Sequence, residues 1–535
     1  MTVNRRDALA LLGSSAALAG FSALNVPAFA QASRDDTIRV AWPYELATLD
    51  PTGVGAQRST WCASIHLYDR LVSYEVNERD DGTRQYDPNT VAPELAESWE
   101  RSGDNKTITF KLQSGATFHD GSPVTAEDVR WSIERALNVP SAAGVMRVGG
   151  ITSADQLSAP DDGTFVVQLT DPNRYSISVF SIPFAIIINK KVALEHATDD
   201  DPWANEWLKF NAAGSGAYKL DDMSSQQLSI SRNPDWASGP APAIEKVIFQ
   251  TIPEATIRTT VVERGSADIA IEIPPNDFAA VAQRGQAQAV AIPMPNHMDF
   301  MAFNSQAEPF NDIRVRQAVA HSLPYDDIFN TVFQGRGIPL HGGNGSARPG
   351  EFPQPHSFMR DIEKAKALLA EAGHADGFTT SIAYAQGKAA IFDPLALAIR
   401  GALLDVGITV DIQPLPGSSF SEGIASRTLP LMLDNRIAWL SQPDYWFRAF
   451  YTGDSTSNMG NYQSDKLKSM LDALPGDASD EVYAEKTGEM ANLVLTEIPM
   501  LPMRQGAFEL VMAKGIAGYT YWFHGLPDAR SLSRA

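Results

Sequence analysis

The chain holds a single cysteine, Cys62, among its 535 residues. One thiol cannot form an intramolecular disulfide, so a large buried core must stabilise the fold. Basic residues are also scarce, because 43 Lys and Arg face 64 Asp and Glu and leave a formal net charge of −21. A chain this acidic is repelled by nucleic acid and by anionic lipid headgroups, which argues against partners of either kind.

The motifs of several common enzyme classes are missing as well. The chain has no G-x-S-x-G nucleophile elbow, no H-E-x-x-H zinc motif and no phosphate loop ending in lysine. His66 lies four residues after Cys62, but such a pair on a helix is far more often packing than catalysis. We therefore expect no enzymatic activity, no built-in metal and no cofactor.

The N-terminus has the pattern of a removable export signal. Two adjacent arginines, Arg5 and Arg6, precede a weakly apolar run to about Leu24, and an Ala-Phe-Ala site at 28–30 follows. Glycines and serines dilute this run, whereas a spanning helix needs roughly 20 strongly apolar residues. The paired arginines resemble the twin-arginine signal, although Asp7 is an unusual neighbour. No cysteine stands at the cleavage site, so we expect a soluble, periplasmic protein without a lipid anchor.

The first half of the mature chain predicts strands and an amphipathic helix. Residues 37–42 and 107–112 alternate as half-buried strands, and Phe165, Val167 and Leu169 mark another. The apolar run at 185–188 is expected to be a buried strand. Thr125 and Asp128 form a capping-box pattern at the start of a helix.

The second half alternates strands with helices. Asp312 is expected to cap a helix through Ser322, and Asp361 to start one that stops at Gly373. Residues 379–385, 395–406 and 409–412 then form a strand, a helix and a strand. This βαβ pattern predicts an α/β fold with mixed sheets covered by helices.

Several separated segments resemble one family in the order that the family has them. They are the stretch from Ala92 to Glu100, the Phe118–Val129 stretch with its His-Asp-Gly turn, the Gly214–Tyr218 turn, Pro309–Val319, Lys364–Gly373, and Asn458 with Tyr462. Together they are similar to the family 5 extracellular solute-binding proteins of ABC importers, which include dipeptide, oligopeptide and nickel binders. The His119-Asp120-Gly121 segment is a structural turn in that family.

The resemblance implies a two-lobed periplasmic binding protein fold with mixed sheets, crossover hinge strands and an extra subdomain inserted in the first lobe. We expect an export signal at 1–30, lobe I at 36–77 and 186–292, the inserted subdomain at 78–185, lobe II at 293–502, and a return to lobe I at 503–535. It also implies a monomer that captures a small peptide or similar organic solute between closing lobes. The partners would be an inner-membrane permease and its ATPase subunits.

The candidate solute-binding residues lie in three segments where the chain enters the expected cleft. One segment follows the first strand, another precedes the strand at 300–304, and the third is 435–446, which resembles the family's pocket loop. The candidates are Trp42, Tyr44, Asn296, His297, Asp299, Arg436, Trp439, Tyr445 and Trp446. Aromatic side chains supply apolar walls and polar groups fix orientation; packing in the core is the alternative for the aromatic residues.

The third segment departs from the peptide binders of the family. These commonly carry an aspartate three residues after a tryptophan, and it pairs with the free amine of the peptide. Here Arg436 stands where the tryptophan is expected and Trp439 where the aspartate is expected. The departure predicts weak binding of peptides with free amino termini and favours a solute with an acidic group, unless Asp434, Asp444 or Asp299 supplies the anion.

Two other functions remain open at this point. A nickel or metal-chelate binder would use His297 as a contact, and a chaperone-like holder would need a broad exposed apolar groove.

Overall fold

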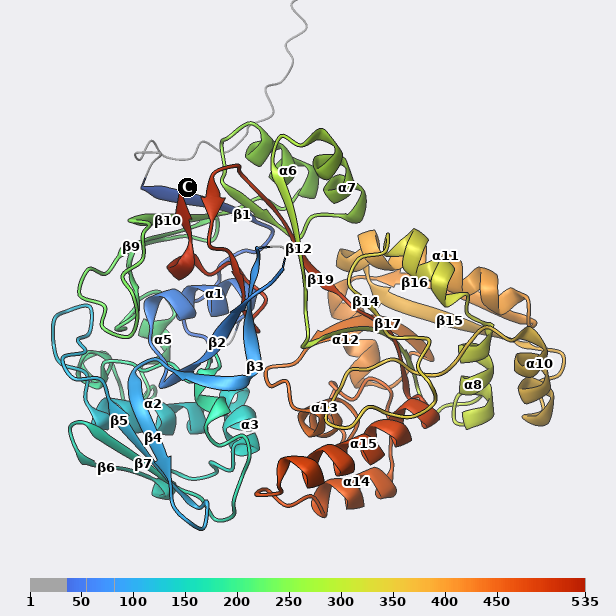
Figure 1. Cartoon of the computed structure of the whole chain (residues 1–535), viewed down its shortest axis with the longest axis horizontal. Helices are drawn as coiled ribbons and strands as arrows, with labels where there is room; N and C mark the ends of the chain where they lie inside the picture. The colour runs from blue at the N-terminus through green and yellow to red at the C-terminus, as the bar shows by residue number, and fades with distance from the viewer. Residues whose placement is uncertain (1–35, 54, 81, 535) are drawn as a thin grey trace, which may run out of the picture.

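The computed structural model describes residues 36–53, 55–80 and 82–534, and the expected signal with Arg5 and Arg6 lies outside them. Two lobes lie side by side, each built around a mixed sheet with helices packed against it (Figure 1). None of the helices in the described ranges is long and apolar enough to cross a membrane. The fold class expected from the sequence is confirmed.

The sheet of lobe I combines strands from both ends of the chain. Its order is β12-β19-β11-β1-β10-β9-β8, with β1 parallel to β10 and β11. The strands are β1 (Thr37–Trp42), β8 (Tyr218–Met223), β9 (Gln227–Arg232), β10 (Lys246–Thr251), β11 (Ile269–Ile271), β12 (Gln288–Pro293) and β19 (Ala507–Met512). Every residue of β1 is buried, as expected for a strand with neighbours and helices on both sides.

The sheet of lobe II is built from one continuous stretch of chain. Its order is β14-β18-β13-β17-β15-β16, and β15 and β16 form the expected parallel βαβ pair. The strands are β13 (His297–Phe303), β14 (Ile338–Pro339), β15 (Phe378–Ala385), β16 (Ile408–Leu415), β17 (Leu431–Ile437) and β18 (Met500–Gln505).

Smaller sheets complete lobe I. A four-stranded sheet of order β4-β5-β7-β6 forms a layer at one end of the lobe, with α2 and α3 beside it (Figure 1). Its strands are β4 (Ala96–Arg101), β5 (Thr107–Leu112), β6 (Leu157–Asp161) and β7 (Thr164–Gln168). The other small strands are β2 (Val72–Glu78), β3 (Arg84–Pro93), β20 (Ile516–Ala517), β21 (Thr520–Tyr521) and β22 (Ser533–Arg534).

The helices follow capping signals in the sequence. Thr125 and Asp128 form the predicted capping box of α2, and Asp312 and Asp361 cap α8 and α10. The helices are α1 (Arg58–Leu67), α2 (Ala126–Asn138), α3 (Pro140–Val148), α4 (Lys190–Leu194), α5 (Asn205–Leu208), α6 (Ala255–Glu263), α7 (Pro275–Arg284), α8 (Ile313–Ser322), α9 (Tyr325–Asp327), α10 (Ile362–Glu371), α11 (Ala389–Leu404), α12 (Gly417–Ala425), α13 (Pro443–Phe450), α14 (Asp465–Asp472) and α15 (Asp480–Glu497).

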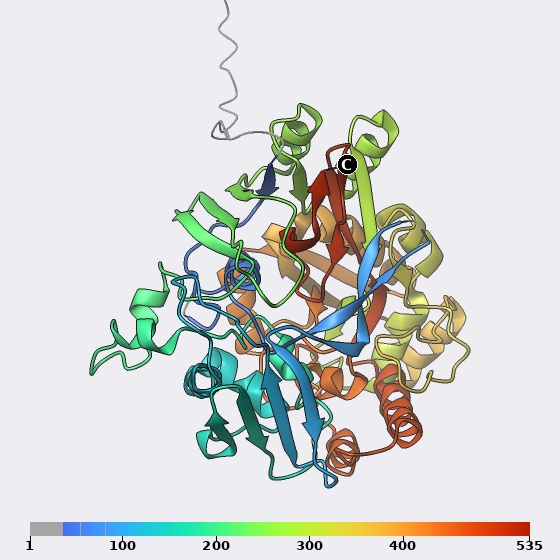
Figure 2. The same cartoon turned by 60° about the vertical axis from the view of Figure 1, so that its left-hand side comes forward.

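Two crossings join the lobes. The chain leaves β12 in lobe I and enters β13 in lobe II, then returns from β18 to β19 through Gly506. Because β12 pairs with β19, the two crossings run next to each other, as Figures 1 and 2 show. The second change of sheet falls after Gln505, so lobe II extends a few residues beyond the expected boundary at 502.

The strand predicted at Ala185–Ile188 is wrong. This segment is fully buried but lies outside every described sheet. Its backbone amides bond to irregular neighbours instead, with Ile187 N–H donating to Asp69 O at 2.9 Å and Ile188 N–H donating to Ser132 Oγ at 2.9 Å. An apolar run therefore predicted burial correctly and the type of element incorrectly.

Candidate functional site

Two of the three expected solute-binding segments are neighbours in lobe II, and the third lies in lobe I. The β13 and β17 strands are antiparallel neighbours, with Met298 opposite Arg436 and Asp299 opposite Asn435. The 296–299 and 434–446 segments are therefore adjacent in lobe II. Trp42 and Tyr44 stand at the end of β1 in lobe I.

Aromatic side chains join the lobes across this boundary. The ring of Trp439 from lobe II packs edge-on against Trp61 at 5.0 Å and Phe184 at 5.1 Å, both from lobe I. Tyr86 of lobe I also shares a hydrogen bond of 3.1 Å with Ser441. These contacts bring the two lobes together at this boundary.

The two residues predicted after the first strand differ in environment. Trp42 is 1% exposed and its ring stacks on Phe249 at 4.7 Å, while its indole Nε1 has no hydrogen-bond partner in the described part of the chain. Tyr44 donates its hydroxyl hydrogen to Glu272. Burial raises the pKa of Tyr44, and the negative charge of Glu272 raises it further, so this hydroxyl stays protonated.

Asn296 serves the framework at the crossing. Its Nδ2 donates to Ala438 O and to Phe523 O, both at 2.9 Å, and its Oδ1 accepts from the Tyr521 hydroxyl at 2.8 Å. These bonds use its amide within the protein. The geometry therefore gives Asn296 a structural role in the closed state, where the sequence predicted contact with solute.

His297 and Asp299 are two residues apart in β13, next to the crossing at Gly506. The Nδ1 of His297 accepts a hydrogen bond of 3.0 Å from Gly506 N–H, and its Nε2 lies 3.7 Å from Asp299 Oδ1. Burial lowers the pKa of His297 to about 4, so the ring is neutral near pH 7. Arg504 donates to Asp299 Oδ2 at 2.6 Å, and Asp299 Oδ1 is buried without a hydrogen-bond partner among the described residues.

Arg436 pairs with one of the aspartates that the sequence offers as possible sources of the anion. Its guanidinium pairs with Asp434, which is 3% exposed and also receives Lys388 Nζ. Lys388 donates to Asn435 Oδ1 at 2.9 Å as well. The departure from the family's pocket loop is therefore a cluster of two cations around one carboxylate, defined here as the 434 cluster (Lys388, Asp434 and Arg436).

Tyr445 and Trp446 open helix α13 behind the Trp439 turn. Tyr445 lies 6.5 Å from the ring of Tyr175 in lobe I and is 6% exposed. Trp446 is fully buried against Phe352 and Phe450, and its Nε1 has no partner in the described ranges. The core-packing alternative therefore describes the ring of Trp446, whereas its indole donor remains unused.

Sequence reasoning missed four contributors to the boundary. Lys388, Trp61, Phe184 and Arg58 stand in segments that carry no distinctive motif. Lys388 lies 46 positions before Asp434 and reaches it only because β15 and β17 are neighbouring strands. A covariation signal between sequences is the kind of information that would find such a pair.

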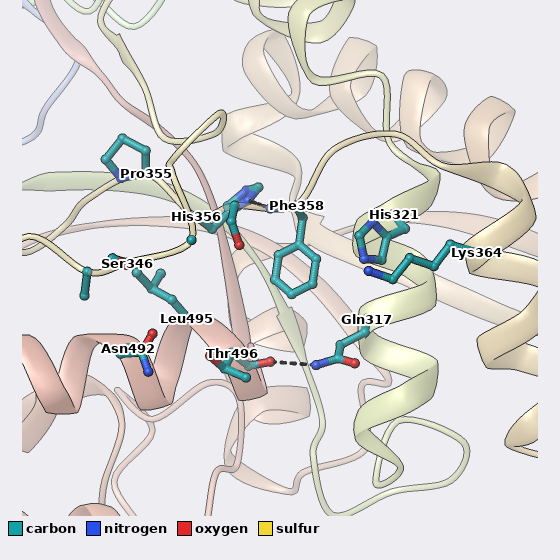
Figure 3. Close-up of a pocket in the computed structure, with 13 residues that line it drawn as sticks. Gln317, His321, Ser346, Pro355, His356, Phe358, Lys364, Asn492, Leu495 and Thr496 are labelled. Carbon is teal, nitrogen blue, oxygen red and sulfur yellow. Dashed lines mark hydrogen bonds between the residues drawn. The ribbon is translucent and has the colours of Figure 1, made fainter.

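A separate cavity of about 190 Å³ lies within lobe II (Figure 3). It is lined by Gln317, His321, Gly345, Ser346, Ala347, Pro355, His356, Ser357, Phe358, Lys364, Asn492, Leu495 and Thr496. Polar groups in it already bond within the protein, for example Gln317 Nε2 to Thr496 O at 3.1 Å. Because lobe I contributes no lining residue, a solute held there would not draw the lobes together.

No group of three or more His, Cys, Asp or Glu side chains within the described ranges is arranged to hold a metal ion.

Cys62 and His66 are fully buried packing residues, since Cys62 donates to Pro527 O and His66 Nε2 accepts from Ala529 N–H at 2.9 Å. The His119-Asp120-Gly121 segment is a turn in which Gly121 has a φ of +86°.

The model of the bacterial extracellular solute-binding proteins, family 5, matches residues 90–458. The chain belongs to this family. The members of this family are binding components of ABC importers. The function class expected from the sequence, a solute-binding component of such an importer, is therefore confirmed.

Curated relatives align along most of the solute-binding protein. The probable D,D-dipeptide-binding periplasmic protein DdpA of Escherichia coli is 27% identical over 93% of this chain and 94% of its own length. The periplasmic oligopeptide-binding protein OppA of Salmonella typhimurium is 23% identical over 96% and 94%.

Solved structures share the two-lobed fold. The dipeptide-binding protein from a Pseudoalteromonas species, in complex with Met-Leu, has a TM-score of 0.78 at 20% identity and covers 93% of this chain and 100% of its own. AgaA from Agrobacterium tumefaciens, in complex with agropinic acid, has a TM-score of 0.74 at 24% identity and covers 93% and 99%.

Proposed function

We propose that this protein captures a small peptide or peptide-sized organic solute in the periplasm and delivers it to an inner-membrane permease driven by ATPase subunits. The observation that supports the proposal is the contact of Trp439, a candidate site residue of lobe II, with Trp61 and Phe184 of lobe I. The relatives are named as dipeptide-binding and oligopeptide-binding proteins, which supports a solute of this size.

The proposed site consists of predicted residues near the boundary, and three of them have a buried polar atom without a hydrogen-bond partner among the described residues. The unpartnered buried atoms Trp42 Nε1, Asp299 Oδ1 and Trp446 Nε1 are three of the predicted residues' polar groups, and such atoms call for a partner. Gln442 Oε1 is a further one. Tyr44, His297, Arg436, Trp439 and Tyr445 complete the proposed set around them.

Nickel or a metal chelate remains the second candidate solute, and the observation that bears on it is the single neutral imidazole of His297 at the boundary. A metal solute would stabilise the protein against heat only when the metal is added. The chaperone-like alternative would need a broad exposed apolar groove, but only seven large apolar residues of the described chain are exposed, among them Phe210, Met359 and Leu404.

A stabilising solute is expected to make the monomer more compact. Solute that contacts both lobes favours the closed state by its differential affinity, and a solute at about 100 times its Kd adds about 2.7 kcal/mol of stability. Thermal-shift screening of solute libraries finds the ligand, and small-angle scattering then measures the radius of gyration with and without it. An unchanged radius would contradict closure.

Arg174 makes contacts between the lobes, so its replacement gives a variant for the scattering experiment. Arg174 of lobe I donates to Asp480 at 2.9 Å and to Ala478 O at 2.7 Å in lobe II. Arg174→Ala should enlarge the unliganded protein and weaken binding by up to about tenfold, because partly exposed pairs are worth about 1 kcal/mol. Arg147→Ala, an exposed arginine of the same subdomain, is the control.

Replacement of Arg5 and Arg6 by lysines is expected to trap the precursor in the cytoplasm, because the twin-arginine pair is read as an address by its own export route. Cell fractionation and detection of the uncleaved precursor measure the effect. Purified protein of this variant should still bind solute. Normal export would instead assign the protein to the general secretory route.

A further inference from the structure

The 434 cluster carries more positive than negative charge. Asp434 is held between Lys388 and Arg436, and although burial alone would raise the pKa of its carboxyl, the two cations lower that pKa below its usual range. Asp434 is therefore ionised, and it can neutralise only one of its two partners. Lys388 and Arg436 keep part of their side chains exposed, at 36% and 26%, so both can reach a solute.

The other carboxylates of the boundary do not correct this excess. Asp299 pairs with Arg504, and Glu509 pairs with Arg336, which makes each of these pairs neutral. On the lobe I side, Arg58 and Arg258 interact with the charge of Glu272, and Arg258 also with that of Glu254, so these groups balance and the excess comes from the 434 cluster. Positive charge thus exceeds negative charge at this boundary in a protein whose formal net charge is −21.

His297 does not change this balance of charge. Burial lowers the pKa of its ring, and the charge of Asp299 opposes that effect only in part. The ring is therefore neutral near pH 7 and balances neither Lys388 nor Arg436.

The carboxylates that could have received an ammonium group already pair with cations. Asp434 holds two cations, and Asp299 holds Arg504 through its Oδ2, while its Oδ1 has no hydrogen-bond partner among the described residues. Asp444 is 4% exposed and accepts from the Tyr483 hydroxyl while Arg448 approaches it at 3.3 Å. A buried ammonium without a partner costs several kcal/mol, so this boundary disfavours a free amine.

We propose that the solute presents a carboxylate to Lys388 and Arg436 while its apolar part lies against Trp439, Trp61 and Phe184. The inference rests on the proposed function and adds the chemical class of the solute. Arg436 is suited to a planar carboxylate, because a guanidinium donates two parallel hydrogen bonds to it. A single negative charge matches the excess of one cation in the 434 cluster, whereas a phosphate dianion would be repelled by Asp434.

The test compares three forms of one dipeptide by calorimetry with the full mature protein. The probes are Met-Leu, N-acetyl-Met-Leu and Met-Leu amide, and 3-phenylpropionate represents a free organic acid. We expect N-acetyl-Met-Leu to bind at least as tightly as Met-Leu, and the amide to bind about 10- to 100-fold more weakly than Met-Leu. Binding of 3-phenylpropionate alone would identify a free acid as the source of the carboxylate.

Three charge variants complete the test, with unfolding midpoints as the check on folding. Lys388→Met and Arg436→Met should each weaken the carboxylate probes about tenfold or more. Asp434→Asn should keep or strengthen their binding, because it removes the competing anion. Lys486→Met, an exposed lysine of lobe II, should leave binding unchanged.

Equal binding of Met-Leu and its amide, a clear preference for Met-Leu over its N-acetyl form, loss of binding in Asp434→Asn, or no binding of any carboxylate probe at millimolar concentration would overturn the carboxylate assignment. None of these results removes the proposed import function. That function fails separately, if no stabilising solute of any charge makes the protein more compact.

Discussion

Replacing Gly214 with alanine is expected to lower the free energy of unfolding by about 3 kcal/mol or more. A Cβ at this position would lie 1.9 Å from the carbonyl oxygen of Leu67 and 2.9 Å from Tyr68 Cδ1. The Gly214–Tyr218 turn lies directly on the end of α1, where Gly216 N–H donates to Leu67 O at 3.1 Å. Backbone must move to admit the methyl group, because a carbonyl of an ordered helix end has no alternative rotamer.

Denaturant unfolding followed by tryptophan fluorescence measures this loss. Gly401→Ala is the matched control, since Gly401 lies in α11 and a Cβ there has nothing within 4 Å. Alanine in an exposed helix interior should raise stability by about 0.5 to 1 kcal/mol. If both variants had the same unfolding midpoint as the parent, close packing of the turn on α1 would not be the reason for the glycine.

Arg135→Met is expected to destabilise the protein by about 3 to 5 kcal/mol, because it leaves a buried carboxylate without its cation. Arg135 of α2 is 1% exposed and its Nη2 lies 2.5 Å from Asp50 Oδ2. Its other donors reach Thr52 Oγ1 at 3.0 Å and Asn205 Oδ1 at 2.7 Å. This network fastens the inserted subdomain to the start of lobe I, so its loss should affect that junction first.

A double-mutant cycle separates the ion pair from simple loss of packing. Asp50→Asn combined with Arg135→Met should cost less than the sum of the single variants, because neither charge then remains buried alone. Lys486→Met removes one partner of an exposed pair with Glu489 and should change stability by less than about 0.5 kcal/mol. A strictly additive cycle would refute the proposed coupling.

Local signals in the sequence predicted local structure well. The hydroxyl of Thr125 and the carboxylate of Asp128 are three residues apart and need no distant partner, so their capping box could be recognised directly. The segment at 185–188 shows the limit of such signals. Its amides bond to Asp69 O and Ser132 Oγ, and these partners are brought to it only by the tertiary fold.

The helix of the βαβ unit illustrates another limit. The sequence predicted a helix from about residue 395 to 406. The helix instead begins at Ala389 and contains Pro394 in its interior. Packing of Phe392 in the core of lobe II accounts for the additional turn.

For the candidate site, the sequence predicted the segments and not their pairings. The sequence pointed to 296–299 at the expected crossover and to 435–446 as the family's pocket loop, and the structure pairs the β13 strand with the β17 strand at the start of that loop. It could not show that Arg436 shares Asp434 with Lys388, since that depends on which strands are adjacent in the sheet. Charge balance at the boundary is therefore a property of the tertiary structure.

The crossing of the chain at Gly506 also sets an order for biosynthesis. Lobe II consists of consecutive residues, so it can be completed as soon as β18 has been made. Lobe I cannot be completed at that stage, because its strand β19 lies between β11 and β12. Arg534, near the end of the chain, also donates to Thr37 O at 2.6 Å at the first residue of β1. In a growing chain, β11 and β12 of lobe I therefore lack their neighbour β19 until the second lobe has been synthesised. A chain interrupted just after residue 505 would retain a whole lobe II beside a first lobe that lacks a central strand.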